Sequence, residues 1–221
     1  MRTIPTRAAG ALFLALAAGH LATQLAGADT AAQATQFLLM PALAAVVLTV
    51  PPGPLTRPLL VALGFSWLGD SVPALFTGDT AFLTMVGLFL CAQITYAVAF
   101  WPLRGESVLG RPAVAVYVAA FGGLLVACVP GAGGLLVPVV VYGLCLTLVA
   151  VLSTGVHRLA GIGGALFFVS DGLIALRAFA DWYTPPVPGF WVMLTYVAGQ
   201  ALITAGVLAR QRVPVAAGTP A

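Results

Sequence analysis

Residues 158–179 read RLAGIGGALFFVSDGLIALRAF, and this stretch decides how the whole chain is interpreted. Between Arg158 and Arg177 it contains a single charged side chain, that of Asp171. A helix of this length is about 33 Å long, and the hydrocarbon core of a bilayer is about 30 Å thick. The stretch therefore predicts a membrane-spanning helix that carries one carboxylate inside the membrane.

The composition extends this interpretation to the rest of the chain. Of the 221 residues, 61% are hydrophobic and only 7% are charged, whereas soluble domains are about 25% charged. Backbone polar groups in lipid must be satisfied within each segment, so the predicted fold class is an all-α polytopic transmembrane helical bundle. The arginines are scattered singly, which argues against nucleic-acid binding. The three cysteines show neither a disulfide framework nor the spacing of metal ligands.

About eight stretches are long and apolar enough to span a membrane, and we expect them to form one integral membrane domain over residues 1–221. The breaks fall at turn-forming residues, such as 51–54 (PPGP) and 130–131 (PG). The predicted spans are approximately 8–27, 36–52, 57–77, 81–101, 112–129, 134–153, 158–179 and 188–209.

The first of these spans has an alternative interpretation. Arg2 and Arg7 precede its apolar run, and residues 26–28 (AGA) resemble a cleavage site, so the segment could be a signal peptide. The run is longer than the usual signal-peptide core, which favours an uncleaved first span.

The arginines predict the orientation of the bundle. With eight spans, all but Arg177 lie on one side of the membrane, whereas the opposite loops contain Asp29, Asp79 and Asp181 and no arginine. The positive-inside rule then places both termini in the cytoplasm of a multi-pass protein of the cell membrane. The eight residues on the predicted cytoplasmic side are Arg2, Arg7, Arg57, Arg104, Arg111, Arg158, Arg210 and Arg212.

Two carboxylates, Asp70 and Asp171, fall inside predicted spans at matched positions. Each follows its cytoplasmic arginine, Arg57 or Arg158, by thirteen residues. Thirteen residues of helix correspond to about 20 Å, so both acids should lie near the outer boundary of the hydrocarbon core. Small residues flank each acid and permit close helix approach. The matching offset also suggests two four-helix halves related by an axis along the membrane normal.

Each membrane carboxylate costs roughly 2.5–3.5 kcal/mol on insertion scales and normally faces the bundle interior. Two carboxylates close together in a water-poor interior share a proton, which is what general acid–base catalysis requires. The alternative is that Asp70 and Asp171 only form hydrogen bonds that knit helices together.

Other polar side chains in the spans are candidates for contact with a substrate or with an aspartate. Gln93 and Tyr96 lie on one stripe of the fourth span, and Tyr196 and Gln200 are spaced i, i+4 in the eighth. Arg177 is a possible phosphate contact or an interfacial anchor. The predicted substrate-binding residues are Ser66, Gln93, Tyr96, Ser170, Arg177, Tyr196 and Gln200.

These segments resemble the YhhN family of integral membrane proteins, which includes the lysoplasmalogenases. The resemblance is carried by residues 65–70 (FSWLGD), by Phe89 through Tyr96 and Phe100, and by residues 164–171 (GALFFVSD). The length and the eight apolar spans agree with it, so it covers nearly the whole chain.

The resemblance implies hydrolysis of the vinyl-ether bond of lysoplasmalogens, with Asp70 and Asp171 as the catalytic pair. It implies a lysophospholipid substrate taken from the membrane and neither metal nor organic cofactor. Gln93 stands where many members have His, and since glutamine cannot shuttle a proton, proton transfer at this position is not expected here. A small proton-coupled transporter that uses the same aspartates, and a structural membrane protein, are the alternatives.

Overall fold

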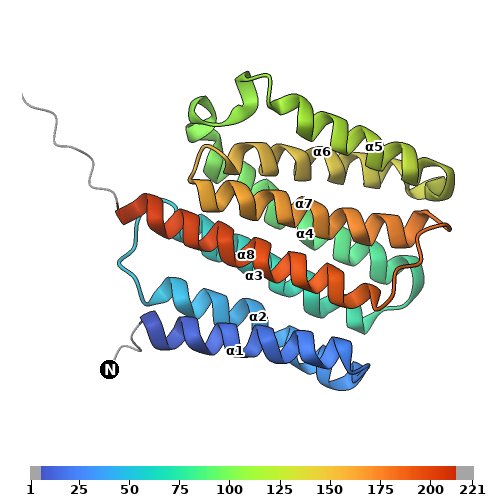
Figure 1. Cartoon of the computed structure of the whole chain (residues 1–221), viewed down its shortest axis with the longest axis horizontal. Coiled ribbons are helices and arrows are strands. Elements are labelled where there is room, and N and C mark those ends of the chain that lie inside the picture. The colour runs from blue at the N-terminus through green and yellow to red at the C-terminus, as the bar shows by residue number, and fades with distance from the viewer. Residues whose placement is uncertain (1–5, 213–221) are drawn as a thin grey trace, which may run out of the picture.

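The computed structural model describes residues 6–212, which form eight α-helices and four short 3₁₀ segments and contain no strand (Figure 1). The α-helices are α1 (Thr6–Leu25), α2 (Asp29–Leu48), α3 (Thr56–Ser71), α4 (Gly78–Phe100), α5 (Val114–Ala132), α6 (Leu136–Ser153), α7 (Arg158–Phe179) and α8 (Pro188–Arg212). The 3₁₀ segments are η1 (Val72–Leu75), η2 (Trp101–Glu106), η3 (Val108–Gly110) and η4 (Gly133–Leu135).

The predicted all-α membrane bundle is confirmed. Seven helical stretches in the described part of the chain are long and apolar enough to cross a membrane. One of them, 114–153, is 40 residues long and contains α5, η4 and α6. The number of crossings and the cytoplasmic location of both termini stay predictions.

Several helix bounds differ from the predicted spans, and two of the differences have a clear physical reason. The helix α2 begins at Asp29, ahead of the predicted start at 36, because its first turns are polar and escape a search for apolar runs. The helix α5 continues through Pro130 to Ala132, so the predicted break at 130–131 is wrong. The turn comes instead at Gly133, whose φ of +48° is a conformation that glycine adopts without strain.

The helices α7 and α8 pack closely because glycines line their interface. A methyl group on Gly206 would lie 2.4 Å from the backbone nitrogen of Ala160. A methyl group on Gly163 would lie 2.6 Å from the backbone oxygen of Gly199. Small residues allow helix backbones in a membrane protein to approach in this way. These contacts fix the rotation of α7, which carries Asp171.

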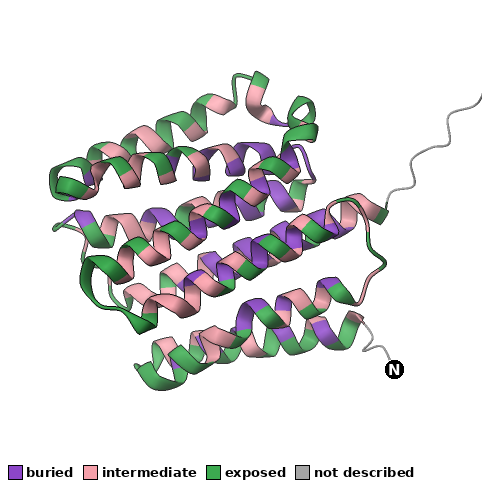
Figure 2. Cartoon of the chain, turned by 180° about the vertical axis from the view of Figure 1, so that it is seen from behind, coloured by how far each residue is buried: buried purple, intermediate pink, exposed green. Residues whose placement is uncertain are grey.

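Burial is concentrated in the centre of the bundle, whereas the helices at its edges are largely exposed (Figure 2). The helix α5 buries only Cys128 and Ala132, both near its C-terminal end. Its outer face is apolar, as at Val116 and Val126, which are 70% and 76% exposed. An apolar face of this kind suits contact with lipid chains.

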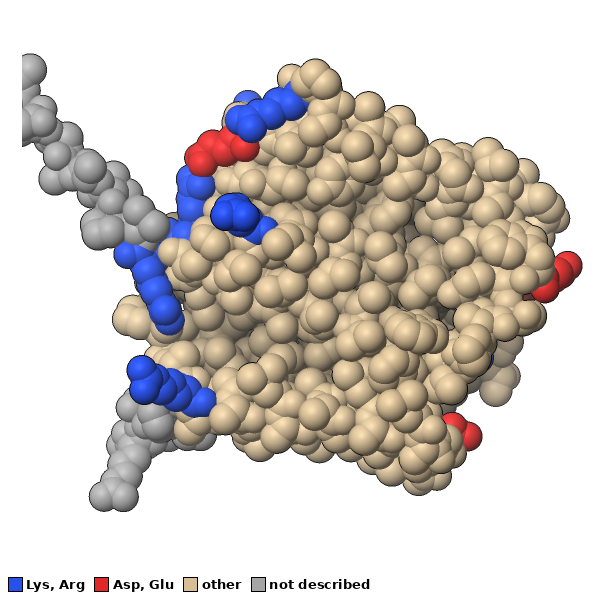
Figure 3. Space-filling model, in the orientation of Figure 1, with Lys and Arg blue, Asp and Glu red and all other residues tan. Residues whose placement is uncertain are grey.

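Arginine side chains gather at one end of the bundle (Figure 3). On the face shown, the opposite end carries acidic side chains and no arginine. Glu106, which follows α4, forms a two-point ion pair with Arg210 near the end of α8, with N–O distances of 2.6 Å. The distribution agrees with the arginine pattern from which the orientation was predicted.

Candidate functional site

Asp70 and Asp171 line the same cavity, which we call the polar cavity. Asp70 is the penultimate residue of α3, and Asp171 lies in the middle of α7. The cavity also contacts α2, α4 and α8 and has a volume of about 840 Å³ including its opening. Its wall includes Gln33, an exposed residue in the second turn of α2.

Each carboxylate oxygen of Asp70 accepts a hydrogen bond. Gln36 of α2 donates from Nε2 to Oδ1 over 3.1 Å. Tyr196 of α8 donates from its hydroxyl to Oδ2 over 2.8 Å. Since an ionised carboxylate only accepts hydrogen bonds, this arrangement suits the charged form of Asp70.

The hydrogen bonds of Asp171 are distributed differently. Gln93 of α4 donates from Nε2 to Oδ2 over 3.2 Å, and the hydroxyl of Tyr142 of α6 donates to the same oxygen. Within residues 6–212 no hydrogen bond to Oδ1 is found. The free oxygen can therefore carry a proton, while Oδ2 acts as the acceptor of a neutral carboxylic acid.

Tyr196, whose hydroxyl donates to Asp70, packs against two other aromatic rings. The ring of Tyr196 lies 5.7 Å from that of Phe89 and 5.9 Å from that of Phe167, measured between centroids. Phe89 and Phe167 also contact each other edge-to-face at 6.3 Å. Such aromatic pairs add to the stabilisation from burial alone. Gly69 makes room for this cluster, because a methyl group there would lie 2.7 Å from the Phe89 ring.

A second buried network connects α3, α4 and α8. Tyr96 donates from its hydroxyl to Oε1 of Gln200 over 2.8 Å, and Gln200 donates from Nε2 to Oγ of Ser66 over 3.1 Å. All three side chains are almost fully buried. They bond to one another and are not part of the polar-cavity wall, so their predicted contact with a substrate stays a prediction.

The other predicted substrate-binding residues occupy different places. Gln93 bonds to an aspartate, which is one of the two roles expected for it. Tyr196 and Ser170 line the polar cavity, and Ser170 also donates to the backbone oxygen of Val192 over 3.1 Å. Arg177 is exposed on α7. Contact of any of these with a substrate stays a prediction.

The sequence analysis missed two donors, Gln36 and Tyr142. The predicted span begins at Gln36, whereas α2 begins about two turns earlier at Asp29, so the position of Gln36 inside the helix was not recognised. Tyr142 is a tyrosine in the middle of the very apolar α6. A hydroxyl at that position needs a buried partner, and this requirement was the signal that could have identified it.

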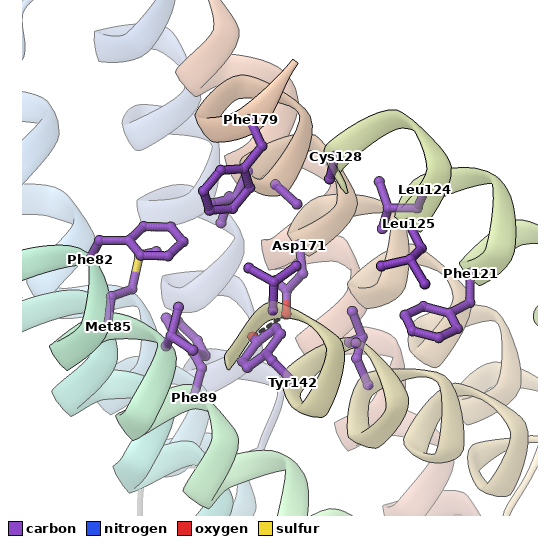
Figure 4. A pocket seen from close by; sticks show the side chains of 16 residues that line it. Phe82, Met85, Phe89, Phe121, Leu124, Leu125, Cys128, Tyr142, Asp171 and Phe179 are labelled. Atoms are coloured by element: carbon purple, nitrogen blue, oxygen red, sulfur yellow. Dashed lines mark hydrogen bonds between the residues drawn. The ribbon is translucent and has the colours of Figure 1, made fainter. Parts of the chain in front are cut away.

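A second cavity adjoins Asp171 on the other side, and we call it the apolar cavity (Figure 4). It lies between α4, α5, α6 and α7 and has a volume of about 630 Å³ including its opening. Asp171 and Tyr142 are the polar side chains of a wall that is otherwise hydrophobic. Residues that line both cavities are Met85, Phe89, Asp171 and Ile174.

The described residues contain no group of three or more histidine, cysteine, aspartate or glutamate side chains placed to hold a metal ion. The side chains that donate hydrogen bonds to the two carboxylates are two tyrosines and two glutamines. Carboxylates facing one cavity are suited to proton transfer and to stabilising a cation.

Comparison with known proteins identifies the family. The sequence model of the YhhN family matches residues 31–207. The chain belongs to the YhhN family. The match to this family runs from α2 to α8 and includes both aspartates and all four of their hydrogen-bond donors. The resemblance predicted from the sequence is thus confirmed.

Three curated relatives all have the word lysoplasmalogenase in their names. A protein of Mycobacterium bovis named lysoplasmalogenase is 34% identical over 190 residues, which covers 80% of this chain and 70% of that protein. The human protein named lysoplasmalogenase TMEM86B is 33% identical over 181 residues, covering 71% of this chain and 74% of its own. Its counterpart in Rattus norvegicus is 32% identical over 160 residues, covering 72% of this chain and 64% of its own. No solved structure matches significantly.

Proposed function

We propose that this protein is a lysoplasmalogenase-like hydrolase of the cell membrane. Its substrate is a lysoplasmalogen taken from the bilayer, and its products are a fatty aldehyde and glycerophosphoethanolamine or glycerophosphocholine. The observation that carries the proposal is that Asp70 and Asp171 line one cavity inside a membrane bundle. The relatives named lysoplasmalogenase support the reaction type.

The depth of the two carboxylates fits this substrate. The vinyl ether of a lysoplasmalogen lies just below its glycerol backbone, at the boundary of the hydrocarbon core. The spacing from Arg57 and Arg158 places both acids about 20 Å into the membrane, near that boundary on the outer side. A lipid in the outer leaflet can then present its vinyl ether to both acids without leaving the membrane.

Hydrogen bonding assigns a different role to each acid. Asp70 accepts one hydrogen bond on each oxygen, so we assign it the ionised form. Asp171 accepts both of its hydrogen bonds on Oδ2, so we assign it the neutral form with the proton on Oδ1. Asp171 is then the general acid, and Asp70 the electrostatic partner and general base.

The reaction begins when Asp171 transfers its proton to the β-carbon of the vinyl ether. The α-carbon and the ether oxygen then share the positive charge of an oxocarbenium ion, which the carboxylate of Asp70 stabilises, as in glycoside hydrolysis. Asp70 removes a proton from water as the water oxygen bonds to the α-carbon, and a hemiacetal forms.

Collapse of the hemiacetal restores both acids. Asp70 returns its proton to the glycerol oxygen as the carbon–oxygen bond breaks, and the hemiacetal hydroxyl gives its proton to Asp171. The aldehyde and the glycerophospho-alcohol leave, with Asp171 again protonated and Asp70 again ionised. One water is consumed, and these steps use no metal or organic cofactor.

The proposal is tested with purified protein in detergent micelles and a lysoplasmalogen. We expect release of aldehyde from wild type, loss of that release in Asp70→Asn and Asp171→Asn, and full activity in Asp181→Asn, which changes an exposed loop acid. In D₂O one deuterium should appear on the carbon next to the aldehyde carbon. In ¹⁸O-labelled water the glycerol product should stay unlabelled, because water attacks the vinyl carbon.

Two outcomes would reject the proposal. Absence of aldehyde together with uptake into vesicles driven by a proton gradient would favour transport by the same aspartates. Folded wild type and variants without either activity would favour a structural role for the two acids.

A further inference from the structure

We infer that the apolar cavity between α4, α5, α6 and α7 is the binding site for the substrate's hydrocarbon chain, and that side chains of α5 set the chain length it accepts. The identity of the chain rests on the proposed function. The cavity itself and the presence of Asp171 in its wall come from the structure.

The two cavities differ in polarity as the two parts of a single-chain lipid do. The polar cavity suits a headgroup, and the apolar cavity suits a hydrocarbon chain. The polar cavity contacts Gln33 near the start of α2 and Pro73 in η1, which lie toward the end of the bundle that carries Asp29 and Asp79. It therefore extends from Asp171 toward the predicted outer surface, where a headgroup belongs. The apolar cavity begins at the same aspartate and is almost free of polar side chains.

The apolar cavity and the polar cavity share part of their walls. Phe89 and Met85 of α4 and Asp171 and Ile174 of α7 line both cavities. A molecule that occupies both cavities would lie beside the carboxyl group of Asp171. This is where the vinyl ether must be held for protonation, because a general acid acts within hydrogen-bond reach of its target.

Aromatic side chains line both ends of the apolar cavity. Toward the outer end, Phe82 and Phe179 meet edge-to-face with centroids 5.5 Å apart, beside the buried Cys128. Toward the inner end, the ring of Phe121 covers Gly143, where an added methyl group would lie 2.4 Å from the ring. A chain that enters at Asp171 and runs past α6 toward α5 therefore meets Phe121.

The helix α5 supplies a stripe of cavity-facing side chains at i, i+3, i+4 and i+7. The stripe consists of Phe121, Leu124, Leu125 and Cys128 (Figure 4). Val126 lies next to Leu125 but is 76% exposed on the opposite face. The same substitution at these two neighbouring positions thus separates an effect on the cavity from an effect on the helix.

The first experiment measures kcat/KM for lysoplasmalogens of increasing alkenyl-chain length. Leu125→Trp fills the cavity and should lower kcat/KM for long chains by about tenfold or more relative to short chains. Phe121→Ala removes the end wall and should shift the preference toward longer chains. Val126→Trp should keep the wild-type profile. Equal profiles in Leu125→Trp and wild type would overturn the inference.

A second experiment does not depend on turnover. A saturated alkyl-ether lysophospholipid with a photoreactive diazirine near the end of its chain is crosslinked to the full-length protein, and the labelled residues are identified by mass spectrometry. Label at Phe121, Leu125 or Leu146, lost in Leu125→Trp and kept in Val126→Trp, supports the inference. Label only on outward residues such as Val126 overturns it.

The two experiments distinguish failure of the inference from failure of the proposed function. Crosslinking inside the cavity without any release of aldehyde would reject the hydrolase and keep the chain site. Release of aldehyde with crosslinks only on the outer surface would keep the hydrolase and reject the chain site.

Discussion

The halves α1–α4 and α5–α8 hold their carboxylates alike but pack their outermost helices differently. Each aspartate accepts one hydrogen bond from the helix before its own, from Gln36 of α2 or Tyr142 of α6. Each accepts a second from the last helix of the other half, from Tyr196 of α8 or Gln93 of α4. This is the pattern that two repeats exchanging their last helices would produce.

The outermost helices differ in what they bury. In the first half, α1 buries His20, whose Nδ1 lies 2.9 Å from the Thr35 hydroxyl of α2. In the second half, α5 buries only Cys128 and Ala132, and a cavity remains between it and the helices that carry Tyr142 and Asp171. The comparison indicates that similar hydrogen bonding serves both acids, while a largely hydrophobic cavity adjoins Asp171 beside α5.

The largest expected effect is loss of either carboxylate. Because the proposed chemistry needs both acids, Asp70→Asn and Asp171→Asn should each lower kcat by about a hundredfold to ten-thousandfold. The double variant should be little worse than either single variant, since the two residues act as one unit. Additive losses in aldehyde release would show that the halves work independently.

The next largest effect is on stability, and it compares a glycine at the α7–α8 interface with a glycine on the surface. Gly206→Leu should destabilise the protein by roughly 1–3 kcal/mol or more, because backbone atoms of Ala160 leave no room for a side chain. Thermal unfolding in detergent measures this. Gly64→Leu is the control, since nothing lies within 4 Å of a methyl group there. Equal melting temperatures for the two variants would contradict the role given to the α7–α8 contact.

The tyrosines allow one donor to be compared in each half. Tyr196→Phe removes a hydrogen bond to the ionised Asp70 and should lower kcat by about tenfold or more, since hydrogen bonds to charged groups contribute about 1.5–3 kcal/mol. Tyr142→Phe removes a hydrogen bond to the neutral Asp171 and should lower kcat by up to about tenfold, since a bond between neutral groups contributes about 0.5–1.5 kcal/mol. Purified variants with unchanged melting temperatures are compared in the aldehyde assay. Wild-type kcat in both variants would mean that neither bond assists the chemistry.

Gln93 should produce the smallest change. Its role at Asp171 is to donate through Nε2, so Gln93→His, which keeps an N–H, should retain more activity than Gln93→Leu. We expect a loss of a few-fold for leucine, in line with a neutral donor contributing about 0.5–1.5 kcal/mol. If leucine and histidine gave the same kcat, donation by Gln93 would be irrelevant to the reaction.

Much of the fold could be predicted from the sequence because apolar run length is a local property. The stretch 158–179 coincides with α7, and both aspartates were located within helices from the lengths and positions of the apolar runs. The break at 130–131 was misplaced because proline is tolerated within membrane-spanning helices, whereas the positive φ at Gly133 is invisible to hydropathy.

The site was only partly predictable. Asp70, Asp171, Gln93 and Tyr196 were identified because polar groups in an apolar span need partners. Gln36 and its acceptor Asp70 are 34 residues apart, so no local pattern connects them. The hydrogen bond that joins Tyr196 to Asp70 crosses 126 residues.

The sequence by itself determined that this chain is a helical membrane protein with two buried acids, because lipid requires long apolar helices and penalises every charge within them. Only the tertiary structure decided which polar groups meet these acids and where the two cavities lie. The reason is physical. Helices that are apolar on all sides do not reveal which face is buried, and their rotation is fixed by close contacts such as those at Gly163 and Gly206.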